Sequence, residues 1–527
     1  MVAYVRTVKT ASGATAVQIV WSSTRGARKI EHLGSAHDEQ QLAALRASGE
    51  EKIAAGQTAL DLGIGEAPPA GPLPITASRM AVLWDTLDSA YRRLGFDTAT
   101  GSDAVFRDLV LARIIEPTSK LDSLRVLEEV GQVPPSYRTI TRRLPVYAKS
   151  AWRQVLSAAC ADHAGIGPAT LLLYDVTTLY FETDTEDEFR KPGFSKERRL
   201  EPQITVGLLT DPAGFPLQIE AFEGNRAETT TMLPTIEAFT AAHQLEAGQV
   251  TIVADAGMVS AANKQALEAV GLRFIIGERL GASVPWIIAD RHKRHPGQEP
   301  DDQMVLTQPI PAGPSDRRRD HVVYYQYRAA RARRTLKGID EQIAKAQSAV
   351  DGKIPVKRNR FVTIKDAKKS INRDLETRNR TLAGWKAYVT NIDAPTPEFV
   401  IGSYHQLWRI EKSFRMTKSD LAARPIYHRL RERIDAHLTI VFAALAITRL
   451  IEGRTGWSIK KFITTARRYR TIEIQAGPQA ITAADPVPAE LQDAITALLA
   501  HQIVLSQAPS TITRIIREVA TSVQVRQ

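Results

Sequence analysis

The stretch ATLLLYD, residues 169–175, is a run of apolar, strand-forming side chains that ends in an acid. Such a run is typical of a central β-strand that is buried on both faces. A second stretch, VTIVADAG at 250–257, repeats the pattern and ends its apolar run at Asp255. Because side chains at the ends of neighbouring strands can converge on one edge of an α/β sheet, the two stretches predict a site that contains Asp175 and Asp255.

The segments around these two runs alternate between strand and helix patterns. ITVGLLTDPAGFPLQIEAFEG at 204–224 predicts an antiparallel hairpin with a DPAG turn. ETTTMLPTIEAFTAAHQL at 228–245 and SAANKQALEAVG at 260–271 predict helices, and RFIIG at 273–277 predicts a returning strand. The order strand, hairpin, helix, strand, helix, strand indicates a mixed α/β core.

A third stretch, YHQLWRIEKSFRMTK at 404–418, reads as an amphipathic helix with a single acid. Seven residues return a helix nearly to its starting face, so Tyr404, Glu411 and Lys418 are expected along one stripe. The alternative is an ordinary surface helix in which Glu411 only relieves the charge of Arg415 and Lys418.

Three carboxylates in one site would have a specific chemical use. Two acids held a few Å apart repel each other, so either one is protonated or a divalent cation lies between them. Asp175, Asp255 and Glu411 together would suit two Mg²⁺ ions about 4 Å apart. The structural alternative is that an Asp after a strand forms a turn or caps a helix. Other acids remain competitors for the site, namely Asp211, Glu228 and Glu278.

Composition narrows the class of partner. The chain has 527 residues, and its 69 Lys and Arg against 58 Asp and Glu give a formal net charge of +11, which favours nucleic acid as the partner.

Cys160 is the only cysteine, which excludes an intramolecular disulfide and a multi-cysteine zinc site and suits a reducing cytoplasm. The sequence has no phosphate-loop or dinucleotide fingerprint. LTIVFAALAI at 438–447 is about half a membrane span, so we expect a buried helix there.

Two basic regions are candidate DNA contacts. Residues 357–386 hold ten Lys and Arg against three acids. This run is either a solvated face or, because aromatic residues interleave with the charge, a phosphate-binding surface. The interleaved aromatic residues are Tyr324, Tyr325, Tyr327, Phe361 and Trp385.

The other basic region is PPSYRTITRRLPVY at 134–147. Basic and polar side chains cluster there at a predicted turn between short helices. A helix-turn-helix that reads DNA and an ordinary corner of a helical bundle both fit this pattern. The residues of the cluster are Tyr137, Arg138, Thr141, Arg142 and Arg143.

Taken together, LLLYDVTTLYF, VTIVADAG and YHQLWRIEKSFRMTK resemble the insertion-sequence transposases of the DDE class, whose RNase H-like core carries two Asp and one Glu. The chain is similar to the branch in which a large insertion precedes the Glu and a Tyr-Arg-Glu-Lys signature surrounds it. The resemblance covers about 165–450 and implies an α/β fold, α+β overall, in which a basic insertion interrupts the core.

The resemblance also implies roles for individual residues. Asp175, Asp255 and Glu411 would be catalytic metal ligands, Tyr404 a phosphate contact, and Lys418 a contact to DNA near the cleaved end. The arginine that the family places three residues after the tyrosine is Leu407 in this chain. The residues that could take its place are Arg409 and Arg415.

The resemblance, the Gly- and Pro-rich stretch at 63–76 and the helical periodicity predict the following division. The parts are 1–62, a β-meander and helix; 63–77, a linker; 78–165, a helical DNA-binding domain; 166–277, the first part of the core; 278–400, the basic insertion; 401–455, the second part of the core with the Glu411 helix; and 456–527, a C-terminal helical region.

The function implied is DNA transposition by metal-dependent strand cleavage and strand transfer. The expected cofactor is Mg²⁺, with Mn²⁺ able to substitute. The expected partners are the terminal inverted repeats, target DNA and further copies of the chain in a dimer or higher oligomer, in the cytoplasm and on the nucleoid. Arg138, Arg142 and Arg143 are the expected contacts to the inverted repeats. The alternatives are a non-catalytic DNA-binding protein and a simple RNase H-like nuclease.

Overall fold

The computed structural model describes residues 2–10, 13–22, 28–56, 73–167, 170–193, 200–258, 260–312, 320–355, 359–365 and 368–500. The chain divides into two compact units. One consists of Met1–Ala77 with Ile472–Ala483, and the other of Ser78–Thr471 with Ala484–Gln527. The acids predicted to form the site all lie in the second unit.

The first unit begins with an antiparallel three-stranded meander covered by a helix. Its elements are β1 (Val2–Lys9), β2 (Thr15–Ser22), β3 (Arg28–Ala36) and α1 (Glu39–Gly56). Val17 and Ile19 point to the same face of the central strand and are fully buried. The apolar–polar alternation of the sequence therefore produces the sheet that it predicts.

A second small sheet has the strand order β16-β15-β4. Its strands are β4 (Ile75–Arg79), β15 (Thr471–Ala476) and β16 (Gln479–Ala484). The region 456–527, predicted as helical, contains strands as well as α16 (Ile459–Ala466) and α17 (Ala489–Leu499), because the alternating run TIEIQA forms a strand between these two helices. Most of the predicted linker and all of 501–527 lie outside the described residues.

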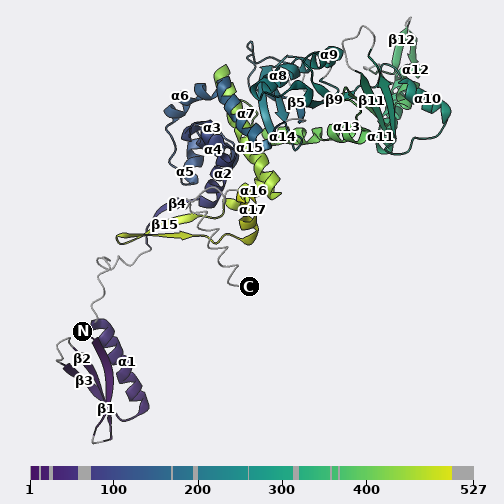
Figure 1. Ribbon diagram of the computed structural model, residues 1–527. Helices are drawn as coiled ribbons and strands as arrows, with labels where there is room; N and C mark the ends of the chain where they lie inside the picture. The colour runs from purple at the N-terminus through teal and green to yellow at the C-terminus, as the bar shows by residue number, and fades with distance from the viewer. Residues whose placement is uncertain are drawn as a thin grey trace. The chain divides into compact units, whose positions relative to one another are not determined.

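The second unit begins with a helical part. It consists of α2 (Ala81–Arg93), α3 (Phe96–Ala99), α4 (Ala104–Ile115), α5 (Ser123–Glu129), α6 (Tyr137–Tyr147) and α7 (Ser150–Ala164). Helix α15 (Arg431–Thr455) packs against α2, α4, α6 and α7 and also against strand β7, so it joins the helices to the sheet (Figure 1).

Helix α15 is the core helix that residues 438–447 predict. Among the described residues it is the one helix long and apolar enough to cross a membrane, and 94% of the window that qualifies it is buried inside the protein. Burial of this kind is typical of a central helix in a globular core.

An eight-stranded mixed sheet forms the centre of the second unit, with the spatial order β10-β11-β14-β9-β8-β5-β6-β7. Its strands are β5 (Leu171–Tyr180), β6 (Gln203–Thr210), β7 (Pro216–Glu223), β8 (Thr251–Ala254), β9 (Arg273–Glu278), β10 (Val305–Ile310), β11 (His321–Tyr327) and β14 (Trp385–Thr390). Strand β6 is antiparallel to both of its neighbours, β5 and β7, whereas β8 and β9 run parallel to β5. The predicted α/β class is confirmed.

Helices pack along this sheet as the sequence pattern predicts. Helices α8 (Met232–Ala242) and α9 (Ala261–Ala269) lie on one side of it in Figure 1. Helices α13 (Pro397–His405) and α14 (Leu407–Ser419) run along the other side, where α14 contacts β5 and α13 contacts β8, β9 and β14.

The predicted insertion is only partly separate from the core. Strands β10, β11 and β14 extend the central sheet, whereas α10 (Trp286–Arg294), α11 (Ala329–Val350), β12 (Val362–Lys365), β13 (Lys368–Ile371) and α12 (Arg373–Thr381) gather beyond its end (Figure 1). The interleaved aromatic residues are not a surface for DNA. They are buried because they pack in the sheet or, for Phe361, in a small core with Ile339 and Ala346.

Two further expectations about local structure are wrong. Asp175 does not end its strand, since β5 continues to Tyr180 through the β-branched run VTT. The predicted helix over 404–418 is broken at Gln406, where the backbone makes tighter i to i−3 hydrogen bonds between α13 and α14. Tyr404 and Glu411 therefore lie on successive helices.

Candidate active site

Asp175 lies in β5 and Asp255 lies just past the end of β8, the parallel strand beside it. The register of β5 and β8 pairs Leu173 with Val253, and both acids come two residues later. Asp255 follows directly after the last residue of β8. Because neighbouring strands are about 4.8 Å apart and i and i+2 point to the same face, continuation of this register puts the two acids side by side.

The face on which they lie follows from the residue before the first acid. Tyr174 is buried and faces Thr231 and Thr235 at the start of α8. Successive side chains of a strand point to opposite faces, so Asp175 points toward the side covered by α14. Glu411 is an exposed residue of that same helix. The sequence-predicted acids thus come from β5, from the end of β8 and from α14.

Tyr404 ties the second acid to this helical layer. Its hydroxyl donates a hydrogen bond to Oδ1 of Asp255, and the tyrosine is only 4% exposed. Burial raises the pKa of Tyr404, and the bond to Asp255 and the nearby charge of Glu411 raise it further. The tyrosine therefore stays protonated and donates to the carboxylate. In this position it orients Asp255.

Lys386 is a site residue that the sequence pattern did not reveal. Its Nζ lies 4.2 Å from the centre of the Tyr404 ring and 5.8 Å from that of Tyr388. Burial lowers the pKa of Lys386, whereas the charges of Asp255 and Glu411 raise it. This lysine belongs to the basic run 357–386, for which the sequence predicts either a solvated face or a phosphate-binding surface. The available signal was its place in the strand pattern WKAYVT.

A cavity of about 380 Å³ opens beside the acids. It is bounded by the residues that follow Asp175 in β5, by Gly257 just after Asp255, and by Lys418 of α14. A side chain at 257 would put its Cβ 3.5 Å from Arg279 and 3.7 Å from Glu228, so glycine leaves this wall open. The charged residues that line the cavity are Arg226, Glu228, Arg279 and Lys418.

The two candidates for the missing arginine have different positions. Arg409 donates from Nη1 to the carbonyl oxygen of Pro212 at 2.8 Å, in the β6–β7 turn. Arg415 is exposed on α14, one turn beyond Glu411. Leu407 is 8% exposed and belongs to the apolar core. Of the two, Arg415 is the one on the same exposed face as Glu411.

Of the three competing acids, two have partners elsewhere in the structure and one lies at the cavity. Asp211 accepts a hydrogen bond from the backbone N–H of Phe215 at 2.7 Å and so shapes the hairpin turn, and burial raises its pKa. Glu278 pairs with Lys264. Glu228 lines the cavity beside the acids and is the competitor that shares the site.

The predicted DNA-reading cluster at 137–143 lies within helix α6 and not at a turn. Ser136 caps this helix by accepting a hydrogen bond from the backbone N–H of Thr139 at 3.1 Å, which is why the helix starts there. Arg138 and Arg142 are exposed on its surface, whereas Arg143 forms an ion pair with Asp103.

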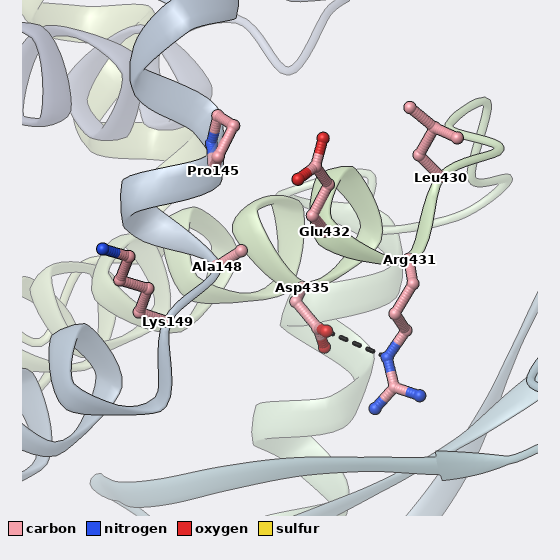
Figure 2. A pocket seen from close by; sticks show the side chains of 7 residues that line it. All are labelled: Pro145, Ala148, Lys149, Leu430, Arg431, Glu432 and Asp435. Atoms are coloured by element: carbon pink, nitrogen blue, oxygen red, sulfur yellow. Dashed lines mark hydrogen bonds and ion pairs between the residues drawn. The ribbon is translucent and has the colours of Figure 1, made fainter.

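Another cavity, of about 480 Å³, lies between the end of α6 and the start of α15 (Figure 2). Pro145 and Lys149 line it on one side, and Arg431 forms an ion pair with Asp435 at 2.9 Å on the other. Since Asp435 also pairs with Arg153 at 3.4 Å, its charge already serves the packing of α15 against α7.

Whether the carboxylates could bind a divalent cation depends on their spacing and on their chemistry. In the described ranges, no three Asp, Glu, His or Cys side chains are gathered closely enough to hold an ion. Asp175, Asp255 and Glu411 are nevertheless oxygen donors of the kind that Mg²⁺ prefers. The donor set therefore fits such an ion by its chemistry.

Comparison with known proteins assigns the family. No curated protein matches the chain. Among solved structures, a piggyBac transposase synaptic complex with hairpin DNA is similar at 11% sequence identity, with a TM-score of 0.36, over 82% of this chain and 74% of that one. Residues 166–447 match the transposase DDE domain. Because this match covers more than half of the 527 residues, the chain belongs to the transposase DDE domain family.

Proposed function

We propose that this transposase hydrolyses one DNA strand at each end of a mobile element and then joins the freed 3′-hydroxyl to target DNA. The observation that supports the proposal is the register of β5 and β8, which pairs Leu173 with Val253 and, if continued by two residues, would bring Asp175 beside Asp255 on the side of the Glu411 helix. The strand order β7-β6-β5-β8-β9, three antiparallel strands followed by two parallel ones, supports an RNase H-like core.

In this proposal Asp175, Asp255 and Glu411 hold two Mg²⁺ ions, for which Mn²⁺ can substitute. The ions, when bound, supply positive charge to the attacking and leaving oxygens of phosphoryl transfer. Tyr404 holds the Asp255 carboxylate in a fixed orientation through its hydroxyl. The proposal therefore makes Tyr404 a positioning residue, in place of the direct phosphate contact that the sequence suggested.

The cavity beside the acids is proposed to hold the DNA backbone near the scissile phosphate. Arg279 and Lys418 line it from opposite elements, the end of β9 and helix α14, and Arg226 lines it after β7. Three cations around a cavity favour a phosphate-rich ligand. The joining step exchanges one phosphodiester bond for another, so the reaction needs no nucleoside triphosphate.

The remaining assignments concern partners. Arg138 and Arg142 on α6 are proposed to contact the terminal inverted repeats, and Arg409, Arg415 and Lys418 flank the catalytic Glu. We further propose that the protein acts as a dimer or higher oligomer on DNA, in the cytoplasm and on the nucleoid.

The test is Mg²⁺-dependent cleavage and strand transfer on DNA that carries the element's own ends. Wild-type protein is compared with Asp175→Ala, Asp255→Ala and Glu411→Gln, and with Glu398→Gln as an exposed acid on α13. The expected result is that the three site variants bind DNA without cutting or joining it, while Glu398→Gln keeps both activities.

Other outcomes would each indicate a different function or a different set of site residues. If wild type binds DNA but does not cut it, the chain is a non-catalytic DNA-binding protein. If it cuts but does not join a pre-cut end to target DNA, it is a nuclease. If one site variant keeps wild-type activity, that residue is not a ligand.

A further inference from the structure

The strand that ends the insertion brings a cation into the acidic site. Lys386 belongs to β14, in which the other five residues are buried. It is half-buried, and its ammonium lies over the ring of Tyr404, whose hydroxyl bonds to Asp255. A lysine loses hydration in such a position, so it needs compensating negative charge.

The compensating charge comes from the proposed metal ligands. Asp255 and Glu411 favour the ammonium form of Lys386, and Arg331 opposes it. His405 also faces the lysine, whose charge helps to lower the pKa of this histidine. Lys386 thus lies within the field of two carboxylates that come from different elements, the end of β8 and helix α14.

We propose that Lys386 is a positioning residue of the site, which balances the charges of Asp255 and Glu411 when no divalent ion is bound and competes with the ion for them. The part that concerns ion binding rests on the proposed function. Since Lys386 is supplied by the last strand of the insertion, the insertion would directly tune the affinity of the site for its ions.

The first experiment works without metal and without DNA. Thermal unfolding is measured in a chelator for wild type, Lys386→Met, Glu411→Gln and the double variant, with the same cycle for Asp255→Asn. Methionine keeps the apolar length of the side chain and removes its charge. The expected result is that Lys386→Met lowers the melting temperature more when the acids are intact than when either is neutralised.

Controls separate charge balance from packing. Lys386→Arg restores the charge and should restore most of the coupling, whereas Lys369→Met, at an exposed position of β13, should change nothing. If the effects of Lys386→Met and the acid substitutions are simply additive in both cycles, the proposal is wrong, whether or not the protein is a transposase.

The second experiment is calorimetric titration with Ca²⁺, which binds hard oxygen sites without requiring turnover. Removal of a competing cation should tighten binding, so Kd for Lys386→Met is expected to fall about tenfold, with Lys386→Arg near wild type. A lysine that mattered only for packing would leave Kd unchanged or raise it, which would overturn the role in ion binding. If Asp255→Asn binds Ca²⁺ as well as wild type does, the proposed metal site fails instead.

Discussion

The hydroxyl of Tyr404 donates a hydrogen bond to Asp255, and through it a residue at the end of α13 fixes a carboxylate at the end of β8. The two residues are 149 positions apart in the chain. The break at Gln406 separates this tyrosine from the helix of Glu411. Two successive helices thus contribute to the candidate site in different ways, one through the tyrosine that bonds to Asp255 and the other through Glu411.

Substitution of Tyr404 by phenylalanine should therefore reduce catalysis and spare DNA binding. Loss of a group that orients a metal ligand typically costs about 10- to 100-fold in metal affinity or activity. We expect a loss in this range for cleavage and an unchanged affinity for the inverted repeat, measured by fluorescence anisotropy. Reduced DNA affinity with unchanged cleavage at saturating DNA would instead support a direct phosphate contact by Tyr404.

The sequence predicted the central part of the fold because its signals are local. The runs that contain Asp175 and Asp255 have strand composition, a helical pattern follows each of them, and Ser260 caps the second helix, so element type and order could be inferred. The position of Lys386 could not, since it depends on how β14 pairs with β9 across more than a hundred residues. The same holds for Tyr404, which a helical wheel aligns with Glu411 but the structure bonds to Asp255.

The exposed arginines Arg138 and Arg142 of α6 should act in binding, and Arg143, which pairs with Asp103, should act in stability. Arg138→Ala and Arg142→Ala are each expected to weaken inverted-repeat binding and to reduce the slope of log K against log salt by about 0.9 for each phosphate that the variant no longer neutralises. Arg143→Ala removes the partner of the buried Asp103 and should cost about 1 kcal/mol of stability, measured by urea unfolding.

A reversed pattern, in which Arg143→Ala changes the salt slope and Arg138→Ala changes stability, would contradict these assignments. Lys149→Ala is the matched control for the loss of one exposed positive charge, since this lysine lies beyond the end of α6.

The aromatic residues of the insertion should behave as core residues. Trp385→Ala is expected to cost about 3–5 kcal/mol of unfolding free energy, because the indole is buried at the start of β14. Trp286→Ala, on α10 of the same insertion, should cost under about 0.5 kcal/mol, since that side chain is 62% exposed. If Trp385→Ala left stability unchanged and weakened DNA binding, the result would instead support the phosphate-binding surface that the sequence offered as one alternative.

A buried basic cluster should make the protein sensitive to acid. Nε2 of His437 donates to the carbonyl oxygen of Ala423, so Nδ1 is left to accept from Lys120 at 3.0 Å. Burial, aided by the charges of Lys120 and Arg113, lowers the pKa of His437 well below its usual range and that of His428 to about 3.

Below about pH 6.5 the unfolded chain therefore binds protons at these histidines that the folded chain does not, so stability falls as the pH falls. Each histidine lowers the free energy of unfolding by at most about 1.4 kcal/mol for each pH unit of this fall. We expect His437→Gln to lose less stability than wild type between pH 7 and pH 5 in urea unfolding, and His428→Gln to do the same. Equal losses in all three proteins would exclude the histidines as the cause.

Introduction of an arginine at position 407 should not rebuild the Tyr-Arg-Glu-Lys signature that the sequence resemblance implies. Leu407 is 8% exposed in the apolar core, and an unpaired guanidinium there would lose its hydration, which we expect to cost about 3 kcal/mol or more in urea unfolding. Trp408→Arg is the matched control, because the next side chain is 57% exposed and should tolerate the charge. A stable Leu407→Arg variant with faster cleavage would show that α14 can turn this position toward the DNA. Lower stability without faster cleavage is the expected result, and it would leave Arg415 as the arginine of α14 that is placed to contact the substrate.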